Sequence, residues 1–228
     1  MASKSAEEAQ AKNIEKMGEA LGKQYSELWQ QVAVLYINWL EYVELFGTNP
    51  ARVELLNQAA PMFFHRIQQD LWEATLLHIC RLTDAPKVAG RNNLTIRNMP
   101  DLINNEQIKE ERTQAVQVAV DQAEFARDWR NRYIAHLDLE LALKEPATPL
   151  ADASRKQVKE VLEAIAKVLN IVAGHYDDSW TPFDMTARHN GSLVLLYVLE
   201  DGVKAREQRA ERAKVGVVLP DDTPMRRL

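Results

Sequence analysis

The sequence contains few of the residues that cross-link a chain or form tight turns. Its single cysteine, Cys80, rules out an internal disulfide and any zinc site of the Cys₄ or Cys₂His₂ type. Eight glycines and nine prolines among 228 residues are few for a fold with many tight turns. This scarcity argues against a sandwich, a barrel or a glycine-rich doubly wound sheet, and it favours an all-α protein.

Long apolar runs and an excess of positive charge are also missing. The most apolar stretches, 32–46 and 193–199, fall short of the roughly 20 residues needed to span a bilayer. The N-terminal residues do not resemble a signal peptide, so we expect a cytoplasmic protein with no membrane contact. With 28 basic and 33 acidic residues the formal charge is −5, which argues against nucleic acid covering the whole surface but permits a local basic site.

Apolar residues recur at steps of three and four along nearly the whole chain, which is the spacing of amphipathic helices. Gly18 and Gly22 are positions at which the first helix can break, and Pro61 should kink or break the second. The pattern predicts helices over 6–46, 50–83, 95–103 and 106–133, a helix that follows a cap at Asp152 or Ser154 and ends near 176, and a final helix over 192–214, with a polar loop over 84–93.

No internal repeat, low-complexity block or long flexible linker divides the chain. We therefore expect one elongated antiparallel helical bundle. We assign residues 1–30 to an N-terminal helical extension, 31–203 to the bundle domain, and 204–228 to the basic end of the last helix and a tail.

The densest group of polar residues lies at the end of the predicted third helix. Arg127, Arg130 and Arg132 precede His136 there. Arginine matches phosphate oxygens and histidine exchanges protons near neutral pH, so the pair can cleave a phosphodiester without a metal. A helix that unwinds near Ala135 would let His136 turn toward Arg130. An arginine-rich helix end that complements the helix dipole, with a core or capping histidine, would give the same pattern.

The order of these residues resembles the R-x₄₋₆-H signature of the HEPN superfamily. Five residues separate Arg130 from His136, and the polar Asn131 follows the arginine, whereas Arg132 lies too close to His136 to fit. Together with the motif, the segments 81–84 (RLTD), 93–96 (NLTI) and 135–138 (AHLD) are similar to the abortive-infection U branch of that superfamily, and the similarity extends over about 32–203.

The resemblance implies a HEPN-type helical bundle that forms a homodimer. In such dimers two copies of the motif face each other and build a composite ribonuclease site that uses no metal and no cofactor. His136 would be the general acid/base, Arg130 would stabilise charge on the phosphoryl oxygens, and Asn131 would orient the scissile group or the histidine. RNA contacts are assigned, as a further hypothesis, to Arg127, Trp129, Arg132 and Tyr133.

The resemblance leaves two functional classes open. One is a ribonuclease in phage defence or in a toxin–antitoxin pair, with RNA as substrate and a cognate antitoxin as partner. The other is a helical module that has lost catalysis and binds a protein or nucleic acid, as some members of the superfamily do. The negative net charge favours the second class, and the intact spacing of Arg130 and His136 favours the first.

Other candidate sites are weaker. The segment 18–24 has only three residues between its glycines and no preceding strand, so it does not match a phosphate-binding loop. No metal site is predicted, because the remaining histidines and carboxylates fit core positions and solvated helix ends; these residues are His65, His78, Cys80, His175, Asp177, Asp178 and His189. The basic run 204–214, with Arg226 and Arg227, is either a solvated helix face or a surface that follows phosphates.

Overall fold

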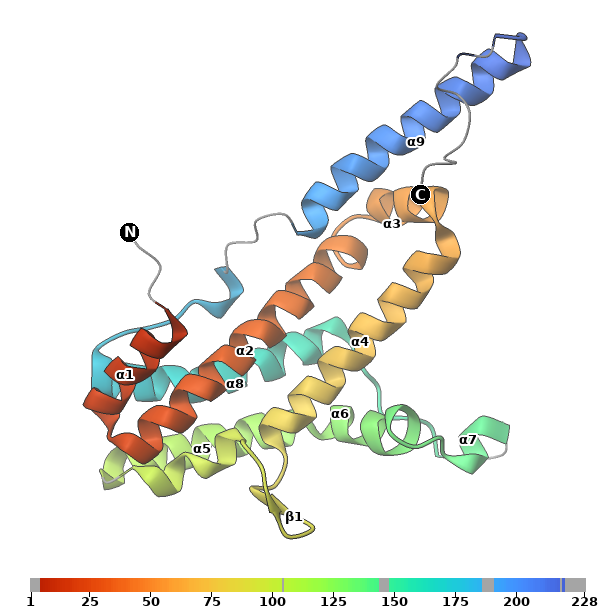
Figure 1. Ribbon diagram of the computed structural model, residues 1–228. Coiled ribbons are helices and arrows are strands. Elements are labelled where there is room, and N and C mark those ends of the chain that lie inside the picture. The colour runs from red at the N-terminus through yellow and green to blue at the C-terminus, as the bar shows by residue number, and fades with distance from the viewer. Residues whose placement is uncertain (1–4, 104, 144–147, 186–190, 218, 220–228) are drawn as a thin grey trace. The chain divides into compact units, whose positions relative to one another are not determined.

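A computed structural model describes residues 5–103, 105–143, 148–185, 191–217 and 219 (Figure 1). Nearly all regular structure within these ranges is helical, and this confirms the all-α fold class. The helices are α1 (Ala6–Met17), α2 (Glu19–Phe46), α3 (Pro50–Ala59), α4 (Pro61–Thr83), α5 (Glu106–Gln122), α6 (Glu124–Trp129), α7 (Leu139–Leu143), α8 (Arg155–Asp177) and α9 (Ser192–Lys214), with short 3₁₀ turns η1 (Ile96–Asn98), η2 (Pro100–Leu102) and η4 (Phe183–Met185) and a π-helical turn η3 (Arg130–Ile134).

Local signals in the sequence set most helix ends. Gly18 separates α1 from α2 with a φ of +81°, a backbone conformation that favours glycine. The side chain of Asn49 accepts a hydrogen bond from the backbone of Ala51, with Pro50 as the first residue of α3. Of the two predicted caps for α8, Ser154 is the one used, and it forms a reciprocal capping box with Gln157.

Two predicted elements are wrong in detail. The helix predicted over 106–133 is interrupted at Ala123, and its last turn is widened into η3. Ala119, Ala123 and Ala126 are all fully buried, so the buried apolar face continues across the break. The expected polar loop contains a small antiparallel pair, β1 (Lys87–Val88) and β2 (Arg91–Asn92), joined by a tight turn in which Ala89 and Gly90 both have positive φ.

The chain divides into two compact units, and α2 and α4 contribute residues to both. The first unit comprises 1–39 and 72–186, and the second comprises 40–71 and 187–228. The division of the sequence at 30 and 203 stays a prediction. No helix within the described ranges is long and apolar enough to cross a bilayer.

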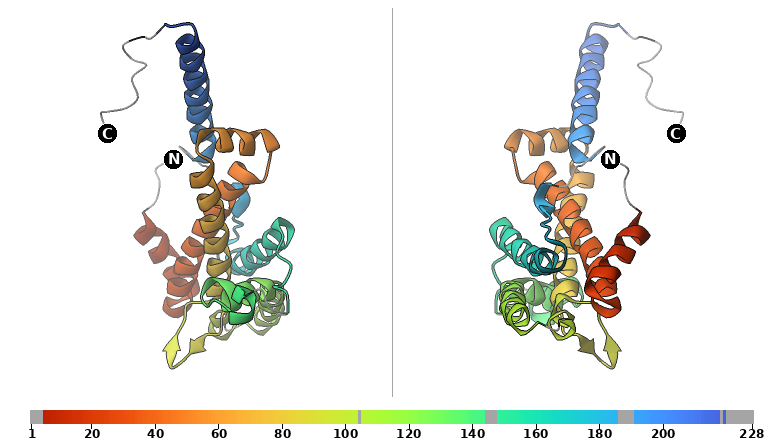
Figure 2. Two further views of the ribbon diagram at one scale, coloured as in Figure 1. Left: turned by 90° about the vertical axis from the view of Figure 1, so that its right-hand side faces the viewer. Right: turned by 90° about the vertical axis from the view of Figure 1, so that its left-hand side faces the viewer.

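The core of the first unit is built mainly by α2, α4, α5 and α8. The most extensive packing joins α5 to α8, which lie side by side (Figure 2). Leu28, Leu76, Ile79, Ile165 and Leu169 are fully or almost fully buried. Each such side chain contributes about 1.5–3 kcal/mol when it leaves water, so this core holds α4, and with it the start of the polar segment that follows, in place.

The second unit has its own small core. Leu45, Leu56, Phe64 and Leu196 form a buried cluster that joins α2, α3, α4 and α9. Glu41 fixes the start of α9, because its Oε2 accepts a hydrogen bond of 2.6 Å from the backbone nitrogen of Ser192.

Candidate functional site

The segment with the arginines and the histidine lies where the α-helix changes into a wider turn. The α-helical pattern of α6 ends at Trp129, and the backbone nitrogen of Ala135 donates to the carbonyl oxygen of Arg130, five residues earlier, at 2.8 Å. Such π-turns are rare and recur at functional sites. The chain leaves the helix just before His136, close to the position that the sequence predicts.

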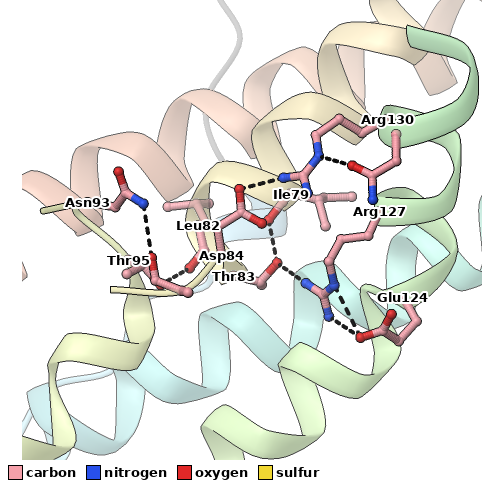
Figure 3. Close-up of polar contacts among 11 residues, drawn as sticks. Ile79, Leu82, Thr83, Asp84, Asn93, Thr95, Glu124, Arg127 and Arg130 are labelled. Atoms are coloured by element: carbon pink, nitrogen blue, oxygen red, sulfur yellow. Dashed lines mark hydrogen bonds and ion pairs between the residues drawn. The ribbon is translucent and has the colours of Figure 1, made fainter. Parts of the chain in front are cut away.

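Arg130 is held on two sides. Its Nη1 forms an ion pair of 2.5 Å with Oδ2 of Asp84, and its Nε donates to Oδ1 of Asn131 at 3.0 Å (Figure 3). The hydrogen bond to Asp84 raises the pKa of Arg130. No hydrogen bond from Nη2 to the described residues is recorded, and a quarter of the side chain is exposed. One edge of the guanidinium is therefore available to a phosphate oxygen.

His136 is exposed and follows the widened turn directly. Within the described residues it has no hydrogen bond or ion pair. The structure thus joins Arg130, Asn131 and Asp84 in one cluster, and it leaves His136 beside this cluster in sequence but not bonded to it. Asn131 is exposed as well, with its oxygen directed to Arg130 and its amide nitrogen left as a donor.

Arg127 joins α6 to the end of α4. Its guanidinium donates to Oγ1 of Thr83 at 3.0 Å and to Oε1 of Glu124 at 2.7 Å (Figure 3). It also donates to the carbonyl oxygen of Val120. All three nitrogens are engaged, since Nε also contacts Glu124. Arg127 therefore positions α6, the helix that directly precedes Arg130, and its assignment as an RNA contact stays a prediction.

Arg132 fastens the turn to the segment that leads into α8. It lies 3.6 Å from Asp128 and 3.5 Å from Asp138, and it donates to the carbonyl oxygens of Thr148 and Pro149 at 2.5 and 3.2 Å. A hydrogen bond from the backbone of Leu141, aided by Arg132, lowers the pKa of Asp138. Arg132 thus connects the turn to residues before it, to residues after it and to the segment that precedes α8.

The two aromatic candidates, Trp129 and Tyr133, differ in their exposure to solvent. Trp129 is half-buried, and its indole Nε1 donates to the carbonyl oxygen of Ala151 at 2.8 Å. Tyr133 is 42% exposed and meets Trp129 edge-on, with ring centroids 5.7 Å apart. Of the pair, Tyr133 offers the ring face on which a base could stack.

The end of α4 supplies Asp84, a residue of the cluster that the sequence does not predict. Thr83 donates through Oγ1 to the carbonyl oxygen of Ile79 at 2.8 Å, and Thr95 donates to that of Leu82 at 2.9 Å (Figure 3). These bonds satisfy carbonyl groups that the helix end leaves open. They fix the backbone that carries Asp84. The RLTD segment contributes to the family resemblance, but nothing local in it indicates a partner 46 residues away.

Comparison with known families shows which family the chain belongs to. A family profile described as AbiU2, of the HEPN type, matches residues 18–194. The chain belongs to the AbiU2 family of HEPN domains. The matched range of this HEPN domain includes Asp84, Arg130, Asn131 and His136, and it ends before most of α9. No curated protein and no solved structure matches the chain significantly.

The remaining candidates occupy ordinary structural positions. Cys80 is buried, and burial raises the pKa of its thiol to about 11. Asp177 pairs with Lys12 and Lys16, which lower the pKa of its carboxyl to about 2. The ring of His175 packs edge-on against Tyr176. No group of three or more potential metal ligands lies within the described residues.

The basic run at the end of α9 is partly neutralised by neighbours on the same helix. Lys204 pairs with Glu200 and Lys214 pairs with Glu211, both at 2.6 Å. This agrees with a solvated helix face. His189, Arg226 and Arg227 lie outside the described residues.

Proposed function

We propose that this HEPN domain is a metal-independent endoribonuclease and that two copies of the chain pair to complete its site. The observation that carries the proposal is Arg130, which is anchored through Nε and Nη1 while its Nη2 makes no recorded hydrogen bond to the described residues. A fixed guanidinium with one open edge stabilises charge that develops on a phosphoryl oxygen, without having to reorganise during the reaction.

His136 supplies the proton chemistry. It takes the proton of a ribose 2′-hydroxyl as that oxygen attacks the adjacent phosphorus, and the bond from phosphorus to the 5′-oxygen breaks. The products are a 2′,3′-cyclic phosphate and a 5′-hydroxyl, whose proton comes from an acid. The motif supplies one histidine per chain, which acts either as the base or as the acid, so the His136 of a second copy provides the other role. This division of roles is the reason for a homodimer.

The test is RNA cleavage by purified protein in the presence of EDTA. We expect wild type to cleave and His136→Ala to lose about 100-fold or more of the rate, since a general acid/base contributes typically 10²–10⁴-fold. The matched control is His65→Ala, which removes an exposed histidine from α4. Equal amounts of intact RNA with wild type and with His136→Ala would refute the proposal.

In an abortive-infection setting such an enzyme would act on RNA during phage infection, or would be held in check by a cognate antitoxin. We include both roles in the proposal. Both require that the ribonuclease activity be restrained in uninfected cells, so wild type, but not His136→Ala, should slow growth when it is expressed during phage infection or without the antitoxin.

One observation favours a second candidate, a helical module that binds a partner protein. In the second unit, α9 exposes a cluster of apolar side chains: Leu193, Val194, Leu195, Tyr197 and Val198. Exposed apolar patches of this kind mark interaction surfaces. This candidate predicts no RNA cleavage by wild type, so the same assay separates the two.

A further inference from the structure

A small polar pocket lies beside the ion pair of Arg130 and Asp84. Its volume is about 300 Å³, at the lower end of the range for small-ligand sites. It belongs wholly to the first unit, with walls from α2, from the end of α4 and from the segment after β2. The lining residues are Gln31, His78, Arg81, Leu82, Asp84, Asn93 and Leu94.

Asp84 connects this pocket to the candidate catalytic cluster. The same side chain lines the pocket and accepts the ion pair from Nη1 of Arg130. A group in the pocket therefore lies next to the carboxylate that holds the catalytic arginine. In a single strand of RNA, adjacent nucleotides would place a phosphate at Arg130 and a base in the pocket.

A histidine and a glutamine form the polar wall. His78 is only 8% exposed, and burial together with Arg81 lowers the pKa of its imidazole, so the ring is uncharged near neutral pH. Its Nε2 lies 3.1 Å from Oε1 of Gln31. In the tautomer that donates from Nε2 to this oxygen, the amide nitrogen of Gln31 keeps both of its hydrogens as donors.

Asn93 adds an acceptor. Its Nδ2 donates to the carbonyl oxygen of Ala85 at 3.0 Å, which fixes the orientation of the amide. Its Oδ1 then faces away from that bond (Figure 3), and it has no recorded donor among the described residues. The pocket thus offers a pair of donors from Gln31 and an acceptor from Asn93.

The other walls suit a flat, partly apolar ligand with a negative charge. Leu82 and Leu94 provide apolar surface, and Leu94 is 39% exposed. The exposed guanidinium of Arg81 can stack on an aromatic base or attract a phosphate. The carboxylate of Asp84 is already balanced by Arg130, so Arg81 leaves the pocket with an excess of positive charge.

We propose that this pocket binds one unpaired nucleobase of the RNA, with Gln31 and Asn93 reading its hydrogen-bonding edge, and that it sets the base preference of cleavage. The link to cleavage rests on the proposed ribonuclease function, whereas binding of the base does not. Single-stranded RNA is the ligand that fits, because its unstacked bases can enter protein pockets and be read on their edges.

The first experiment measures binding without catalysis. The His136→Ala protein is titrated with four fluorescent homopolymers, of A, C, G and U, by anisotropy. We expect unequal affinities, and we expect Gln31→Ala in the same background to reduce the largest difference at least about five-fold. The matched control is Gln30→Ala, which changes the neighbouring residue of α2, outside the pocket. Unchanged differences with Gln31→Ala would overturn the proposal.

The second experiment maps cleavage sites in a randomised RNA. If wild type cleaves with a base preference next to the cut that Gln31→Ala relaxes, both proposals are supported. If the preference is unchanged by Gln31→Ala, the pocket proposal fails while the ribonuclease stands. If wild type does not cleave RNA but the homopolymers still bind with unequal affinities that depend on Gln31, the proposed ribonuclease function is refuted and the proposed base-binding pocket is supported. Binding of nucleoside monophosphates that no homopolymer displaces would overturn RNA as the ligand.

Discussion

At the scale of single residues, the site depends on how many of the nitrogens of each arginine are already paired with acceptors. Arg127 and Arg132 are surrounded by carboxylates and carbonyl oxygens, whereas Arg130 keeps one edge open. The sequence shows three similar arginines, and only the family spacing singles out Arg130. Its partner Asp84 could not have been predicted, because the ion pair depends on how α4 meets α6.

Asp84 is a positioning residue in this account, and Asp84→Asn tests that role. The substitution keeps the shape but removes the charge that holds Arg130. We expect kcat for RNA cleavage to fall about ten-fold or more with little change in KM, because small misplacement of a catalytic group is costly. Asp101→Asn, which changes an exposed residue of the turn η2, is the control. Equal kcat values for the two variants would show that Asp84 does not position Arg130.

Arg112 is a second unusual residue, within the core of the first unit. Its side chain is fully buried, its Nη2 donates to Sδ of Met99 at 3.0 Å, and its Nε and Nη1 have no partner in the described structure. Burial lowers the pKa of Arg112 to about 9. A buried cation without an anion destabilises the folded state.

This predicts a gain in stability for Arg112→Met. Near neutral pH the free energy of unfolding should rise by about 1–4 kcal/mol, as when buried charges are replaced by apolar residues. The unfolded chain keeps the proton up to the ordinary arginine pKa, so the wild type gains stability as pH rises above about 9, and the difference should shrink there.

The measurement is the urea midpoint of each protein near neutral pH and at about pH 10. Lys109→Met, which removes a partly exposed cation from the same helix, should change stability by less than about 0.5 kcal/mol. A loss of stability with Arg112→Met near neutral pH would mean that its guanidinium is paired in solution.

At the scale of elements, helix ends fall into two kinds. Those at Gly18, Asn49 and Ser154 carry residues that act on their own backbone, so the sequence predicts them. The break at Ala123 and the widened turn after Trp129 depend on packing and on contacts such as those of Arg127. Local patterns contain no sign of them.

The contact between α4 and α6 is testable through Thr83. The residue is fully buried, and its hydroxyl accepts from Arg127 while it donates to Ile79. Thr83→Val leaves Nη1 of Arg127 without this acceptor, so we expect the free energy of unfolding to fall by about 1–3 kcal/mol. Thr113→Val is the matched control, because its exposed hydroxyl only bonds back to Lys109. Equal chemical-denaturation midpoints for the two variants would contradict this role.

At the scale of the whole molecule, the net charge of −5 describes the background of the surface and not the site. The composition excludes disulfides and a uniformly basic surface, and the all-α class and the HEPN family follow from pattern and motif. The composite site that we propose cannot be seen in a single chain. That proposal rests on the need for both an acid and a base when the motif of each chain supplies one histidine.

The most direct test of the central claim is the chemistry of the cleaved ends in EDTA. Purified wild type is incubated with single-stranded RNA, and the new 3′ ends are analysed for each of wild type, His136→Ala and His65→Ala. We predict 2′,3′-cyclic phosphates with wild type and His65→Ala, and their loss with His136→Ala. Intact RNA with wild type, or equal amounts of cyclic phosphate with His136→Ala, would contradict the account.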